Sequence, residues 1–181
     1  MITRLLYIWH TVDKTHIGFF AGLAGFAVVL GCITGFAYLD HADRLAARQR
    51  NAELACLAEN VYFEARGEPL VGQYAVAEVT MNRVASPLFP GSVCDVVHAG
   101  HFDPIRGRYV GAFSWTEFDE LEPPRGYEWR RAMAVASTVY DNNLEAPLVN
   151  GALFYHATRV KPDWARTKTR VAHIGRHLFY E

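Results

Sequence analysis

The stretch "LACLAENVYFEARGEP", residues 54–69, decides the fold because it combines an amphipathic helix with a definite end. Its apolar residues recur at i, i+3, i+4, i+7 and i+8, which is the spacing of one face of an α-helix. Gly67 ends this helix, and Pro69 prevents its return. The stretch therefore predicts a helix that packs one face into a core. That face consists of Leu54, Leu57, Ala58, Val61, Tyr62 and Ala65.

Glu64 lies on the apolar face of this helix. At 100° per residue it falls about 20° from Leu57 and about 60° from Val61, whereas Glu59 and Arg66 fall on the opposite face. A carboxylate held among apolar neighbours without an ion pair has a raised pKa, because burial disfavours the charged form. A raised pKa suits a general acid near neutral pH. Glu64 is therefore a candidate general acid.

Two other interpretations of these carboxylates stay open. Glu64 can have a structural role, as the partner of a buried arginine such as Arg83. Glu68, one turn further on, is a possible second carboxylate for a glycosidase pair, but its direction after Gly67 cannot be predicted. It can instead cap the start of the next helix.

The remaining sequence predicts two more helices, a long loop and short strands. Apolar periodicity indicates helices over residues 71–85 and 127–142, separated by a loop over 86–124 that is rich in Gly, Pro and aromatic residues. Residues 151–157 and 177–181 have the aromatic and β-branched character of short strands. Helices followed by a small antiparallel sheet place the domain in the α+β class.

The composition limits the classes of function that this chain can have. The 181 residues suffice for one domain with a real core. The formal net charge is −1, and no run of Lys and Arg is interleaved with aromatic residues, so nucleic acid is not a natural partner. Apolar residues make up 51% of the chain, and much of this excess lies in residues 17–39.

Residues 17–39, "IGFFAGLAGFAVVLGCITGFAYL", contain no charged residue. As a helix they span about 34 Å, enough to cross a hydrocarbon core of about 30 Å. A buried core helix is the alternative, and a cleaved signal peptide fits poorly because its apolar region is only about 7–15 residues long. We predict an uncleaved membrane anchor. The expected division is a tail (1–16), the anchor (17–39), a short helical or frayed stalk (40–50) and a folded domain (51–181).

Positive charges lie on both sides of this span and do not settle its orientation: Arg4 and Lys14 precede it, and Arg44, Arg48 and Arg50 follow it. Small residues at i, i+4 spacing favour close packing of membrane helices. The pairs Gly18/Gly22 and Gly31/Gly35 therefore predict a weak homodimer through the anchors, although such spacing is common by chance.

The cysteines bear on the compartment. Cys32 lies within the span, which leaves Cys56 and Cys94 as a pair in the folded domain. A disulfide between them closes a loop of about 39 residues and stabilises the fold by about 4 kcal/mol on the chain-entropy account. Such a bond persists only in an oxidising compartment. The alternative is two unrelated buried thiols.

Several stretches together resemble a known family. The sequence "CLAENVYFEARGEPLVGQYAVAEVTMNRV" at 56–84 is similar to the signature of SleB-type cell-wall hydrolases, which include the spore-cortex-lytic enzymes. Further similarities are "FPGSVCDVV" (89–97), "FSW" (113–115), "GALFYHATRVKPDWA" (151–165) and "IGRHLFY" (174–180). They cover nearly all of residues 54–180 in the family's order.

The resemblance implies a peptidoglycan-cleaving domain with a lysozyme-like fold, related to the resuscitation-promoting factors. Glu64 matches the family's catalytic glutamate. The resemblance also implies a lytic transglycosylase, which cuts the bond between N-acetylmuramic acid and N-acetylglucosamine and leaves a 1,6-anhydro end. With the anchor, it implies a single-pass protein of the inner (cytoplasmic) membrane, with its catalytic domain in the periplasm or at the cell exterior.

The sequence departs from the family at "SWTEFDELEPPRGYEW", residues 114–129, where many relatives carry a further cysteine and a Cys-Asp-Gly turn; Glu117 stands near that place. A lytic transglycosylase needs one carboxyl group, whereas a muramidase that activates water needs a second at a defined distance. The sequence offers Glu64 in a firm helical position and Glu68, Glu117 and Asp119 in loops. The single-carboxylate reaction is favoured, and the two-carboxylate muramidase is the alternative.

The sugar-binding residues are expected in the loops, where aromatic rings take the apolar faces of sugars and polar groups take their hydroxyl and N-acetyl groups. In a small domain such aromatic residues more often belong to the core, so Ser114 and His156 are the better candidates. The candidates are Phe113, Ser114, Trp115, Tyr155, His156 and Trp164.

Two rival functions remain. A metal-dependent amidase also cleaves peptidoglycan, and His98/His101 and His173/His177 have spacings that allow metal binding, but H-E-x-x-H is absent and no dense ligand set accompanies them. We therefore predict no metal and no cofactor. A non-catalytic wall-binding protein is the other rival, and Glu64 in an apolar face argues against it.

Overall fold

The computed structural model describes residues 14–104, 107–118 and 120–181. Most of the predicted tail (1–16) and Asp119 therefore lie outside the described residues. The chain forms two compact units, residues 1–48 and residues 49–181.

The first helix, α2, runs from Lys14 to Ala65. By length and composition it is long and apolar enough to cross a membrane, the one such helix among the described residues, with a mean hydropathy of 2.0 in its most apolar window. The side chains of residues 20–39 are all exposed. The predicted stalk (40–50) and the helix around Glu64 are parts of α2 and not separate elements. No Gly or Pro interrupts residues 36–66, and the Ala, Leu, Arg, Gln and Glu of this stretch favour the helix.

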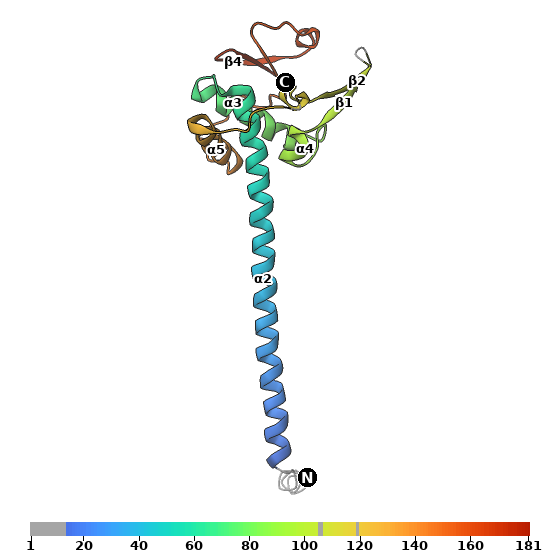
Figure 1. Ribbon diagram of the computed structural model, residues 1–181, viewed down its shortest axis with the longest axis vertical. Helices are drawn as coiled ribbons and strands as arrows, with labels where there is room; N and C mark the ends of the chain where they lie inside the picture. Colours follow the sequence, from blue (N-terminus) through green and yellow to red (C-terminus); the bar gives the residue numbers. More distant parts are fainter. Residues whose placement is uncertain (1–13, 105–106, 119) are drawn as a thin grey trace, which may run out of the picture. The chain divides into compact units, whose positions relative to one another are not determined.

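Three further α-helices belong to the second unit: α3 (Leu70–Ala85), α4 (Val93–Val97) and α5 (Gly126–Tyr140). The helices predicted over 71–85 and 127–142 are thus confirmed, the second ending two residues early. α3 packs against both α4 and α5, and Figure 1 shows α3 and α5 together, with the β1–β2 hairpin extending away from them. One core cluster combines the C-terminal turns of α2 with α4 and α5, together with Ala77 of α3 and Phe113.

The strands form two small antiparallel sheets. β1 (Gly100–Asp103) pairs with β2 (Arg108–Gly111), and the second sheet has the order β3-β5-β4. β3 (Phe154–Ala157) and β5 (His177–Tyr180) are the two predicted strands, and the α+β class with a small antiparallel sheet is confirmed. β4 (Arg170–Ile174) was not predicted, because its exposed residues give no apolar run. His173 lies on β4 and His177 on β5, two strands that pair antiparallel.

The loop predicted over 86–124 contains regular structure, and this prediction is wrong. Besides α4, β1 and β2 it holds a 3₁₀ helix, η1 (Ser114–Glu117). These elements are too short to be stable alone; tertiary contacts hold them. The Cys56–Cys94 disulfide ties α4 to α2. The buried Glu53 accepts hydrogen bonds from Val93 N (2.6 Å) and Cys94 N (3.2 Å), which satisfies the N-terminus of α4.

Candidate active site

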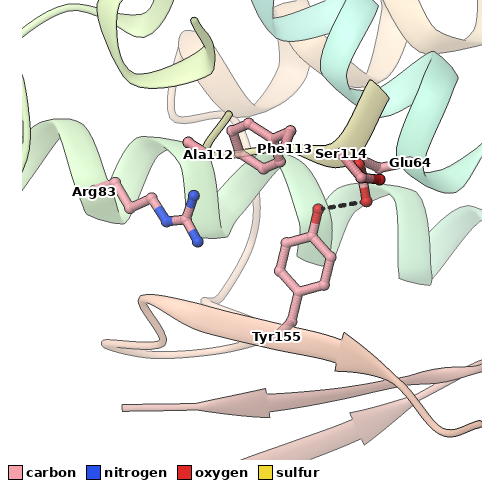
Figure 2. A pocket seen from close by; sticks show the side chains of 6 residues that line it. All are labelled: Glu64, Arg83, Ala112, Phe113, Ser114 and Tyr155. Atoms are coloured by element: carbon pink, nitrogen blue, oxygen red, sulfur yellow. Dashed lines mark hydrogen bonds between the residues drawn. The ribbon is translucent and has the colours of Figure 1, made fainter. Parts of the chain in front are cut away.

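Glu64 lies in the last turn of α2 and is half-buried. Its neighbour Ala65 belongs to a second core cluster that includes Val76, Val79 and Phe179. The Oε2 of Glu64 accepts a hydrogen bond from the hydroxyl of Tyr155 on β3 (3.2 Å), as Figure 2 shows. Burial raises the pKa of Glu64 above its usual 4.5, and the Tyr155 hydrogen bond and the charge of Arg83 lower it only in part. No ion pair among the described residues includes Glu64. Glu64 therefore has the environment of a general acid and not that of a salt-bridge partner.

Tyr155 stays a hydrogen-bond donor to Glu64. Its pKa is raised well above 10.0, chiefly by burial and then by the negative charge of Glu64. The hydroxyl is thus protonated at any physiological pH, and it can stabilise the carboxylate that remains after Glu64 has given up its proton.

Glu64 lies where two cavities meet. The smaller has a volume of about 190 Å³ and the larger about 510 Å³, and both are lined by Glu64, Ser114 and Tyr155. The smaller cavity is completed by Arg83, Ala112 and Phe113. The larger is completed by Phe63, Arg66, Glu68, Trp115, Phe118, Leu121, His156, Ala157, Arg159, Arg176 and His177. A carboxyl group with a raised pKa is thus accessible from an elongated, mostly polar space.

A hydrogen-bonded chain holds one wall of this space in place. Trp115 Nε1 on η1 donates to Asn60 Oδ1 (3.0 Å), and Asn60 Nδ2 donates to Thr80 Oγ1 on α3 (3.1 Å). The Trp115 ring also stacks on Phe63, with the ring centroids 4.7 Å apart. Asn60, which is fully buried, therefore links the cavity wall at η1 to the helices α2 and α3.

Glu68, the possible second carboxylate, lines the larger cavity but is engaged elsewhere. It accepts hydrogen bonds from Arg176 N (2.8 Å) and Arg176 Nε (2.6 Å), at the turn between β4 and β5. Burial acts to raise the pKa of Glu68, but the hydrogen bonds from Arg176 outweigh it and the pKa is lowered. Glu68 is thus ionised near neutral pH and fixes the turn.

Glu117 also has partners of its own. Its Oε2 accepts from Arg108 Nη1 (2.6 Å), and its Oε1 accepts from Gly111 N (3.3 Å). It lines neither cavity around Glu64. Glu117 therefore supports the connection between β2 and η1.

The predicted sugar-binding residues separate into two groups. Phe113 and Ser114 line the smaller cavity, and Ser114, Trp115, Tyr155 and His156 line the larger one. Trp164 lines neither: it packs against His156 and Tyr180, with ring centroids 5.5 Å away in both cases. His156 is held by Tyr180, whose hydroxyl lies 3.0 Å from His156 Nε2. Trp164 thus supports His156 from behind the cavity wall.

In the described part of the chain, no group of three or more His, Cys, Asp or Glu side chains gathers as metal ligands. Of the histidines considered for metal binding, His101 and His173 are exposed on strands β1 and β4, whereas His177 is buried beside Glu68.

Comparison with known proteins places the chain in a family. The sequence pattern of the cell wall hydrolases matches residues 67–180, more than half of the chain. The chain belongs to the cell wall hydrolase family. The catalytic candidate Glu64 lies three residues before the matched range, on the helix that leads into it.

Relatives in this family are spore cortex-lytic enzymes. That of Bacillus subtilis is 32% identical over 131 residues, which are 72% of this chain and 38% of the relative. That of Oceanobacillus iheyensis is 31% identical over 127 residues, covering 70% of this chain and 41% of the relative. The chain thus matches about two fifths of the length of these relatives.

The fold agrees with two solved members of the family. One is the catalytic domain of the Bacillus cereus SleB protein, with a TM-score of 0.52, 28% identity, and coverage of 71% of this chain and 89% of that one. The other is the catalytic domain of the germination-specific lytic transglycosylase SleB from Bacillus anthracis, with a TM-score of 0.53, 28% identity, and coverage of 71% and 93%.

Sequence reasoning missed some residues of the cell wall hydrolase site. Asn60 could have been identified from the sequence, because it is a polar residue four positions before Glu64 and on the same side of the helix. The contact of Arg176 could not have been identified from the sequence, since its hydrogen bond to Glu68 joins residues 108 positions apart.

Proposed function

We propose that this chain is a peptidoglycan-cleaving lytic transglycosylase that cuts the bond between N-acetylmuramic acid and N-acetylglucosamine, with Glu64 as general acid and then base. One observation supports this most: Glu64 has a raised pKa, no ion-pair partner among the described residues and access to both cavities. The name of one solved relative, the lytic transglycosylase SleB from Bacillus anthracis, points to the same reaction.

The reaction needs one carboxyl group. Glu64 gives its proton to the glycosidic oxygen, and the bond from that oxygen to C1 of muramic acid breaks. The C6 hydroxyl oxygen of the same sugar then attacks C1, and its proton passes to the Glu64 carboxylate, so that the acid is restored. Tyr155, which donates to Glu64 Oε2, stabilises the carboxylate between the two steps. No water is consumed, and the product carries a 1,6-anhydro end.

A muramidase with two carboxylates is the second candidate, because Glu68 lines the same cavity as Glu64. It is the weaker one, since Arg176 occupies both carboxylate oxygens of Glu68 and the lowered pKa makes this carboxylate a weak base for activating water. Mass spectrometry of the muropeptides released from purified peptidoglycan separates the two. Anhydro ends support the transglycosylase, reducing ends support the muramidase, and an absence of released muropeptides contradicts both.

We further propose that residues 17–39 anchor the protein in the inner (cytoplasmic) membrane and that residues 51–181 work in the periplasm or at the cell exterior. The apolar helix and the disulfide of the folded domain support this. Pairing of two anchors through Gly18/Gly22 and Gly31/Gly35 stays a prediction.

A further inference from the structure

Arg83 is a buried cation held rigidly beside the smaller cavity. Its side chain extends from α3 and is only 8% exposed. The guanidinium carbon lies over the rings of Phe89 and Phe113, 5.3 and 4.9 Å from their centroids. Arg83 Nε donates to the carbonyl oxygen of Leu153 (2.8 Å). These contacts fix the plane of the guanidinium.

The two terminal nitrogens of Arg83 are left for something else. Within the described residues, no hydrogen bond or ion pair uses them. Figure 2 shows them directed into the space bounded by Phe113 and Tyr155. An unpaired buried charge is costly, and burial accordingly lowers the pKa of Arg83. The cavity therefore offers a ligand two donors and a positive charge that no ion pair among the described residues neutralises.

The ligand that answers this arrangement is a carboxylate. A guanidinium presents two parallel N–H groups that match the two oxygens of a carboxylate. Ser114, an exposed residue that lines the same cavity, adds a hydroxyl. The volume of about 190 Å³, against about 510 Å³ for the adjoining space, suits a small substituent of a sugar whose glycosidic bond lies at Glu64.

Of the two sugars of peptidoglycan, only muramic acid carries a substituent that ends in a carboxyl group, the 3-O-lactyl ether. The carboxylate is free where the stem peptide has been removed and is an amide where the peptide is attached. We propose that the smaller cavity is a subsite for the free lactyl carboxylate, held by the terminal nitrogens of Arg83, so that the enzyme selects glycan strands without stem peptides. This inference rests on the proposed function.

Binding of the lactyl carboxylate also assists Glu64 as the general acid. The positive charge of Arg83 acts to lower the pKa of Glu64. A bound carboxylate offsets that charge and keeps the proton on Glu64 until it is transferred.

Binding to the inactive full-length Glu64→Gln protein tests the subsite without catalysis. The probes are the disaccharide GlcNAc–MurNAc with its free lactyl acid and the same disaccharide as the lactyl methylamide. We expect the acid to bind about 10–100-fold more tightly, the value of a charge-assisted hydrogen-bonded pair. Adding Arg83→Gln should abolish this preference, and Arg83→Lys, which keeps the charge but not the fork, should reduce it. Arg130→Gln, an exposed position on α5 that lines neither cavity, is the matched control.

Two results in the Glu64→Gln protein would overturn the subsite, whatever the Arg83 variants do. One is equal affinity for the acid and the amide, and the other is no measurable binding of either. An acid preference that survives in a folded Arg83→Lys or Arg83→Gln protein at full size would also overturn it, since another residue would then read the carboxylate. The acetamido groups are present on both probes and cannot create a difference. Muropeptide release by the wild-type protein tests the proposed function separately.

Discussion

At the scale of the residue, the protein separates its carboxylates by environment. Glu64 and Glu68 are four positions apart and line the same cavity, yet the pKa of the first is raised and that of the second is lowered. Burial acts on both in the same direction. The difference comes from Arg176, which donates to Glu68 through its backbone and its side chain. Glu64, among the described residues, accepts a hydrogen bond from the neutral Tyr155 and interacts with the charge of Arg83 without an ion pair. Different partners therefore give the two groups different roles.

Replacing Glu64 by Gln should remove activity without unfolding the protein. Gln keeps the shape but cannot deliver a proton, and loss of general acid catalysis costs about 10²–10⁴-fold in rate. The measurement pairs muropeptide release with the melting temperature, beside Glu68→Gln and Glu117→Gln. A Glu64→Gln protein that melts normally and still cuts would contradict the assignment. Equal loss of activity at Glu64 and at one other carboxylate, without unfolding, would point to the muramidase.

The pH dependence of cleavage should show the protonated Glu64. Because its pKa is raised and the acid form is the active one, kcat/KM should fall as pH rises through that pKa. Tyr155→Phe removes a hydrogen bond that lowers the pKa, so this alkaline limb should move to higher pH while kcat falls. A limb that stays in place in Tyr155→Phe argues against the assigned contact.

The Glu68–Arg176 contact should stabilise the fold at neutral pH and lose its effect in acid. In the folded state the pKa of Glu68 lies below 4.5. The contact therefore stabilises the fold at pH values above the unfolded-state pKa of Glu68, and this contribution disappears as the pH falls through the folded-state pKa. Glu68→Gln should lower the stability at pH 7 by about 1–3 kcal/mol, and the difference from wild type should shrink in acid. Urea denaturation at the two pH values measures it, and a pH-independent difference would exclude the ionised contact.

At the scale of the element, short pieces of structure are held by contacts from distant parts of the chain. α4 has five residues, and its N-terminus is satisfied by Glu53 while Cys94 is bonded to Cys56 of α2. The β4–β5 turn depends on Gly175, which has φ +56° and at which a Cβ would clash with Glu68 Oε2. Neither element would persist as an isolated peptide.

Loss of the disulfide should loosen α4 from α2. On the chain-entropy account a bridge across 38 residues of separation contributes about 4 kcal/mol. The Cys56→Ser/Cys94→Ser double variant should therefore unfold at clearly lower denaturant concentration. Thiol labelling of the unfolded, unreduced residues 49–181 should find neither cysteine in the wild type; full labelling of both would show that the bond is absent.

At the scale of the whole molecule, an apolar helix and a cell wall hydrolase domain are combined in one chain. Residues 20–39 expose their side chains along α2, whereas the folded unit buries its apolar side chains in two clusters. Exposed apolar surface of this length needs an apolar surrounding. The membrane anchor that we propose for residues 17–39 would hold a cell wall hydrolase domain near the wall and would account for both parts.

The topology can be tested with reporter fusions placed after Arg50. We expect a reporter that works only outside the cytoplasm to be active there and a cytoplasmic reporter to be silent. The opposite pattern of reporter activity would contradict the proposed location. A matched fusion before residue 14 should behave in the reverse way.

The sequence by itself determined what depends on neighbours along the chain. The uncharged run of residues 17–39, the end of α2 near Gly67 and the position of Glu64 on an apolar face all follow from composition and helical periodicity. Tertiary structure alone decided which partners the carboxylates have. Tyr155 reaches Glu64 across 91 residues and Arg176 reaches Glu68 across 108, and the elements between 86 and 124 form only when packed. Such contacts depend on how distant elements dock, and periodicity within one element carries no information about that.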